Sequence, residues 1–175
     1  MATSLDIWLI TLRWIHILAG ITWIGLLYYF NFVQVPAFKE VDAGTRTALV
    51  PTLVKRALFW FRWTALITVL AGWTYFFSWW AFNGYFALGA GVAPPTGTWD
   101  IAILAGGFFG TMMLINVWGI IWVNQKRIIA AAEAGEALPD MAIRTKRAVI
   151  ASRFNTAMSL PMLFFMVTAS HLPLI

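Results

Sequence analysis

The chain has 175 residues, of which 61% are hydrophobic and only 11% are charged. Soluble domains carry about a quarter charged residues, so this composition indicates a membrane protein. The sequence contains no cysteine, which excludes disulfides, thiolate metal sites, iron–sulfur clusters and covalent attachment of c-type haem.

Four apolar runs predict the fold class. They cover roughly residues 14–33, 58–82, 101–123 and 157–172. Three of them reach the length of about 20 residues that crosses a hydrocarbon core of about 30 Å, and the last is slightly short. Backbone polar groups in lipid must be satisfied within the chain, so each run should be a helix. We therefore predict an all-α polytopic membrane protein, a four-transmembrane-helix bundle that forms a single domain over residues 1–175.

The net charge of +5 is distributed unevenly along the chain. Residues 83–100, between the second and third runs, hold no Lys or Arg. The positive-inside rule therefore places the other two loops in the cytoplasm and both termini on the outer, periplasmic side of a bacterial inner membrane. This pattern gives no reason to expect nucleic-acid binding. The basic residues in or near those two loops are Lys39, Arg46, Lys55, Arg56, Arg62, Lys126, Arg127, Arg144, Lys146, Arg147 and Arg153; Arg13 lies on the other side.

Both basic loops are predicted to be helical. Pro51 suits the first turn of a helix, and basic residues alternate with bulky apolar residues after it. This predicts a short interfacial helix that runs into the second span. The loop after the third run is rich in helix formers, with Gly135 as a C-terminal cap and Pro139 opening the next helix. We therefore expect a cytoplasmic helical hairpin that extends the last two spans.

The first run contains RWIHILAGITWIG, residues 13–25, which includes one of the two histidines of the chain. An ionisable residue in a membrane span is costly, so it is a functional-site hypothesis by default. On a helical wheel the small and polar positions fall within about 80° of one another and should face the bundle. These positions are Arg13, His16, Gly20, Trp23, Leu27 and Asn31.

An imidazole beside a glycine, inside a membrane, suits an axial ligand to haem iron. On this interpretation His16 binds the iron, Gly20 makes room for the macrocycle and Trp23 forms a wall of the pocket. The alternative is a histidine that only hydrogen-bonds to a neighbouring helix. The residue pattern leaves both open.

The second histidine, His171, is a candidate for the other axial ligand. If Arg13 marks the outer boundary of the first span, His16 and His171 lie at the same depth. If the span instead starts near Ile7, His16 lies about ten ångströms deeper, and the two would not easily share one haem. Arg13 favours the first geometry, and we name His16 and His171 as candidate ligands of haem iron.

The later runs carry residues suited to helix packing. Gly106 and Gly110 form a G-x-x-x-G spacing, which lets helices approach closely. Asn116 and Asn155 are predicted to hydrogen-bond between helices.

Two stretches carry a resemblance to a known family. RWIHILAGITWIGLLYYFNFVQVP and LVKRALFWFRW resemble the N-terminal membrane domain of the bacterial membrane urate oxidase (urate hydroxylase, PuuD-type) family. The specific parts are R-W-x-H-x-x-x-G-x-x-W-x-G and the basic-aromatic start of the second span. The close match covers roughly residues 10–75, and the remainder fits in topology.

The resemblance implies a membrane component of a redox system. Full-length members of the family carry a C-terminal c-type cytochrome that accepts electrons from urate oxidation. The present sequence ends at Ile175 without cysteine, so electrons would leave through another protein.

Three functional hypotheses follow from the sequence. The first is a membrane protein that binds haem b and transfers electrons, alone or as a redox subunit. The second is a structural or accessory subunit that packs within a larger membrane complex. The third is a membrane urate or purine oxidoreductase that passes electrons to a separate cytochrome. All three place the chain in a lipid bilayer, with a cytochrome or a larger complex as the protein partner.

Overall fold

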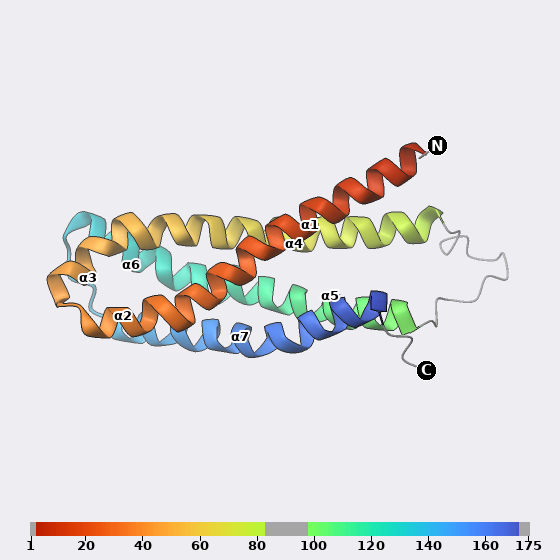
Figure 1. Cartoon of the computed structure of the whole chain (residues 1–175). Helices are drawn as coiled ribbons and strands as arrows, with labels where there is room; N and C mark the ends of the chain where they lie inside the picture. Colours follow the sequence, from red (N-terminus) through yellow and green to blue (C-terminus); the bar gives the residue numbers. More distant parts are fainter. Residues whose placement is uncertain (1–2, 83–97, 172–175) are drawn as a thin grey trace.

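The structure is a computed structural model that describes residues 3–82 and 98–171, without the side chains of residues 98, 170 and 171. All regular structure in these ranges is helical, and the helices join into four long rods (Figure 1). Each rod is long and apolar enough to cross a membrane, which confirms the predicted fold class. The rods are α1 (Ser4–Tyr28), η1 (Tyr29–Gln34) and α2 (Val35–Glu40); α3 (Ala43–Leu49), η2 (Val50–Val54) and α4 (Lys55–Phe82); α5 (Thr98–Asn116), η3 (Val117–Ile121) and α6 (Trp122–Ala134); and α7 (Met141–His171).

The first two rods begin earlier than the apolar runs predicted. A capping box starts α1: the Thr3 side chain accepts a hydrogen bond from the Asp6 backbone, and the Asp6 carboxylate accepts one from the Thr3 N–H. Asp42 caps α3 in a similar way through the Thr45 N–H. Pro51 lies in the first turn of η2, as predicted for a helix start, but η2 is a π-helical segment that continues α3, so this rod already begins at Ala43.

The loop between the last two rods is the predicted helical hairpin. Gly135 ends α6 in the left-handed conformation, with φ at 67°, where glycine has no steric cost. Pro139 lies in the turn directly before α7. The predicted cap is therefore confirmed, and α6 and α7 extend the bundle at this end.

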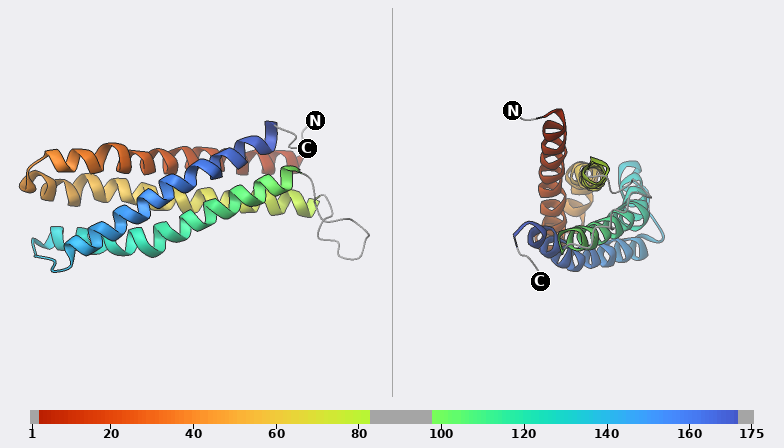
Figure 2. Two further views of the ribbon diagram at one scale, coloured as in Figure 1. Left: turned by 90° about the horizontal axis from the view of Figure 1, so that it is seen from below. Right: turned by 90° about the vertical axis from the view of Figure 1, so that its right-hand side faces the viewer.

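The rods pack as two pairs that diverge at one end. α1 packs along α4, and α5 packs along α7. Figure 1 and the right-hand view of Figure 2 show α1 crossing the bundle, so that its N-terminal turns lie away from α7. We call the end at which α1 begins and α7 ends the terminal end. The opposite end, which carries α3 and the turn between α6 and α7, is the basic end.

The half of the bundle nearer the basic end is closely packed. Two hydrogen bonds fix the first rod against α7 there, from Asn31 to Ser152 at 2.7 Å and between Tyr28 and Ser159 at 2.9 Å. Apolar side chains from all four rods fill the space between them. The buried side chains of this core include Leu27, Phe30, Leu58, Phe61, Val117, Ile121, Ile129 and Ala151.

The predicted interhelical role of the two asparagines is confirmed. Asn116 donates to the Asn155 side chain at 2.7 Å and to the Ala151 carbonyl at 2.8 Å. Asn155 donates in turn to the Met113 carbonyl at 3.1 Å and is fully buried. These bonds hold α5 and α7 in one register.

We expect Asn155→Leu to lower the thermal unfolding midpoint of the protein in detergent. The variant leaves the Asn116 amide and the Met113 carbonyl without this partner, and interhelical hydrogen bonds of this kind contribute about 0.6 to 1.7 kcal/mol. The matched control is Asn124→Leu, because within the described part of the chain the buried Asn124 amide bonds only to the Ile120 carbonyl of its own rod. Equal midpoints for the two variants would contradict the role given to Asn155.

Candidate functional site

A cavity of about 650 Å³ lies between α1, α4, α5 and α7 in the terminal half of the bundle. Sites for cofactors and small molecules usually have volumes of about 300–1,000 Å³, so this one has the size of a cofactor site. Most of its wall is apolar, and the backbone approaches it closely at several glycines. These are Gly20, Gly25, Gly72, Gly106, Gly107 and Gly110.

His16 lines this cavity from α1 with a fixed orientation of its ring. Its Nδ1 lies 2.7 Å from the carbonyl oxygen of Thr68 on α4. A carbonyl oxygen can only accept a hydrogen bond, so Nδ1 is the protonated nitrogen and donates to it. The lone pair of the neutral ring is then on Nε2. Histidines that bind metals commonly donate their second ring nitrogen to a carbonyl in this way.

Gly72 on α4 makes the position of the imidazole possible. A Cβ atom at Gly72 would lie 2.7 Å from the His16 Nδ1 and 2.8 Å from its Cε1, which is closer than real Cβ atoms come to other atoms. Sequence reasoning missed this residue. The available signal was a glycine in the middle of the second apolar run, in VLAGWTY. The contact of Gly72 with His16 on the first run could not be predicted without the packing of the two helices.

The predicted pocket residues of α1 lie together around the cavity. Gly20 lines it one helical turn beyond His16, and a Cβ there would make only an ordinary contact of 3.5 Å with Thr68. Trp23 also lines it and is 1% exposed. The Trp23 Nε1 has no hydrogen-bond partner among the described residues. Buried indole N–H groups usually have one, so this group is a donor available to a bound molecule.

The proposed second ligand, His171, stays a prediction. The backbone of α7 ends at His171, and the side chain lies outside the described residues. α1 begins at Ser4, so His16 lies about 18 Å along its helix from the terminal end. The start of the helix does not mark the membrane boundary, so the relative depth of His16 and His171 stays a prediction as well. Met162 and Met166, on the same helix as His171, also line the cavity.

The G-x-x-x-G pair has two different roles. A Cβ at Gly106 would lie 2.9 Å from the Met166 methyl carbon, so Gly106 permits the close approach of α5 and α7 that the spacing predicted. At Gly110 a Cβ would meet nothing within 4 Å. Gly110 instead contributes open space to the cavity wall.

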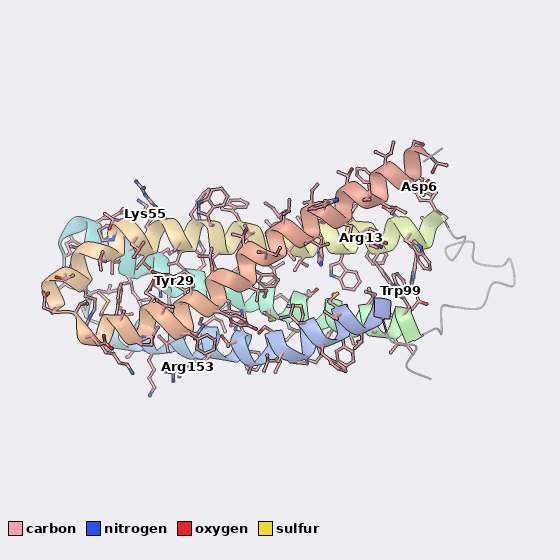
Figure 3. The ribbon with its side chains drawn as sticks, viewed as in Figure 1. Asp6, Arg13, Tyr29, Lys55, Trp99 and Arg153 are labelled. Carbon is pink, nitrogen blue, oxygen red and sulfur yellow. The ribbon has the colours of Figure 1, made fainter. Side chains whose placement is uncertain are left out.

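Arg13 and Tyr75 line the terminal side of the cavity. The Arg13 Nη2 donates to the Tyr75 hydroxyl at 2.5 Å, and the guanidinium carbon lies 5.2 Å from the centre of the Tyr75 ring. Figure 3 shows Arg13 on α1 and Trp99 on α5 near this end of the bundle. The cavity therefore combines a histidine with a free nitrogen, an unpaired indole N–H and one guanidinium.

The family model described as urate oxidase N-terminal matches residues 98–175, which include α5, η3, α6 and α7. The match agrees with the resemblance identified from the sequence over residues 98–175, and the motifs of residues 10–75 lie outside it. No curated protein and no solved structure matches the chain.

Proposed function

We propose that this membrane domain, related to the urate oxidase N-terminal domain over its second half, binds one haem b and acts as an electron-transfer protein or redox subunit. The observation that carries the proposal is the His16 side chain. Its proton is directed to the Thr68 carbonyl, so its Nε2 lone pair is available on the wall of a cavity of cofactor size.

The residues present fit a haem group. The cavity is mostly apolar, as the macrocycle requires, and its glycines remove side chains where a flat ligand would lie. The nearly fully buried Trp23 would form a wall of the pocket against the macrocycle. Haem b held by an axial histidine supplies reversible one-electron chemistry at its iron.

Each residue of the site has a separate task in this proposal. His16 would hold the iron, and the Thr68 carbonyl fixes the tautomer and ring plane of the imidazole. Gly72 leaves the space in which the ring stands. The apolar walls exclude water, which influences the reduction potential of the group they enclose. His171 is the proposed second axial ligand.

A second candidate function is that of a membrane urate or purine oxidoreductase that passes its electrons to a separate cytochrome. The family match favours it, because the family is described by its urate oxidase activity. In this case the cavity, or a surface beside it, also accepts the substrate.

The charge distribution supports an orientation for either function. Among the described residues, all Lys and Arg except Arg13 lie in the half of the bundle nearer the basic end. The proposal therefore places the basic end in the cytoplasm and the terminal end on the periplasmic side of a bacterial inner membrane. The haem cavity would then be open to a periplasmic cytochrome or a larger complex as electron acceptor.

A haem titration of the purified protein tests the proposal. We expect about one haem b per chain by pyridine haemochrome analysis, with a reduced-minus-oxidised spectrum typical of histidine ligation. A folded wild-type protein that stays colourless with added haemin would contradict it and favour the accessory-subunit hypothesis. Urate consumption by the haem-loaded protein with an added electron acceptor would establish the second candidate.

A further inference from the structure

We infer that Arg13 and Tyr75 form a carboxylate-binding pair that holds the propionate groups of the haem, so that the acidic edge of the macrocycle faces the terminal end. The inference rests on the proposed function, because it assigns an orientation to the haem in the same cavity. It concerns residues for which the sequence offered no role in binding.

The first argument is the charge of the cavity wall. Arg13 is the only Lys, Arg, Asp or Glu among the described residues that line the cavity. A carboxylate placed against an otherwise apolar wall loses solvation, and a cation that also donates hydrogen bonds compensates best for this loss. A dicarboxylate ligand is therefore most stable with its carboxylates at Arg13.

The second argument is that the Arg13 guanidinium is positioned but not neutralised. The Tyr75 hydroxyl accepts a hydrogen bond from one N–H of the guanidinium, and the guanidinium lies over the Tyr75 ring. The other N–H groups of Arg13 are left available to a ligand. Arg13 has no ion pair within the described residues, whose salt bridges join Lys55 to Glu133 and Arg144 to Asp140. A planar guanidinium held in this way suits bidentate binding of a carboxylate.

The third argument is the spacing from the proposed iron ligand. Arg13 precedes His16 by three residues on α1, which places both on one face with a rise of about 4.5 Å. On α4, which runs the other way, Tyr75 follows Gly72 by the same three residues. The pair therefore lies one helical turn toward the terminal end from the imidazole on both helices. A molecule bound at His16 presents one edge to Arg13 and Tyr75.

The experiment compares the binding of haem b and of its dimethyl ester, in which the propionates carry no charge, to the haem-free protein in detergent. Wild type should bind the free acid roughly tenfold to a hundredfold more tightly than the ester, as expected for a charge-assisted hydrogen bond. Arg13→Gln should bring this ratio close to one, whereas Arg13→Lys should retain part of it. Tyr75→Phe should reduce it, and Arg56→Gln, at the exposed basic end, should leave it unchanged.

Three outcomes would overturn the inference. Equal binding of acid and ester by wild type would show that the propionates do not contact Arg13, while the haem proposal would stand. Benzoate serves as a small carboxylate probe that is not part of a haem. If Arg13→Gln lost benzoate binding but kept the wild-type ratio of acid to ester affinity, Arg13 and Tyr75 would bind a diffusible anion and not the propionates. Failure of both haem forms to bind folded wild type would remove the proposed function together with the inference.

Discussion

Replacing His16 by alanine is expected to leave a folded, monodisperse protein that has lost its haem. The imidazole makes one hydrogen bond to the protein, to the Thr68 carbonyl, and an interhelical bond of this kind contributes only about 0.6 kcal/mol on average. The same ring is the proposed iron ligand. The pyridine haemochrome content should therefore fall from about one per chain to near zero, with little change in the thermal midpoint of the haem-free protein.

Two further variants test this expectation. His16→Gly with added imidazole should regain the haem spectrum, because the small ring can occupy the space that the side chain leaves. His171→Ala should keep its haem but change from a low-spin to a high-spin spectrum if His171 is the second axial ligand. A His16→Ala protein with a full complement of haem and an unchanged spectrum would contradict the assignment of His16.

The fold could be predicted from the sequence because lipid allows few alternatives. Apolar runs of span length must be helices, and a polar residue within them must have a partner. For this reason the four rods and the interhelical hydrogen bonding of Asn116 and Asn155 were both predicted correctly. The ends of the rods were not, because they depend on local caps at Thr3 and Asp42 that extend the helices beyond the apolar runs.

The candidate site could be predicted only on one helix. The periodicity of the first run is sufficient to place His16, Gly20 and Trp23 on one face, and the structure brings all three to the cavity. The complementary residues, Thr68 and Gly72, belong to α4. Their contacts with His16 depend on the register between α1 and α4, and this register cannot be predicted from the periodicity of either helix.

The bundle divides the tasks of stability and binding between its two halves. Near the basic end, Tyr28 and Asn31 fix the first rod to α7, and buried side chains fill the core. Toward the terminal end, α1 diverges from α7, and glycines line the cavity between the helices. Substitutions around the cavity are therefore expected to change binding more than folding, which makes glycine variants informative probes of the site.

Gly72→Ala should weaken haem binding about 10- to 100-fold, the range observed when the groups that orient a metal ligand are altered. The new Cβ would lie 2.7 Å from the His16 Nδ1, so the ring or the helix must move. Movement of the ring breaks its hydrogen bond to the Thr68 carbonyl and displaces Nε2. Overpacking of this kind costs about 1–3 kcal/mol. The measurement is the haem dissociation constant from absorption titration, together with the thermal midpoint of the haem-free protein.

Two other glycines of the same cavity provide matched controls. A Cβ at Gly20 would make an ordinary contact with Thr68, and one at Gly25 would meet nothing within 4 Å. Gly20→Ala and Gly25→Ala narrow the cavity by the same methyl group without touching the imidazole. Any loss of haem affinity in them measures the narrower cavity alone, and it should be smaller than the loss in Gly72→Ala. If all three variants lost haem equally, the effect would come from the narrower cavity, whereas wild-type affinity in Gly72→Ala would show that α4 does not set the position of His16.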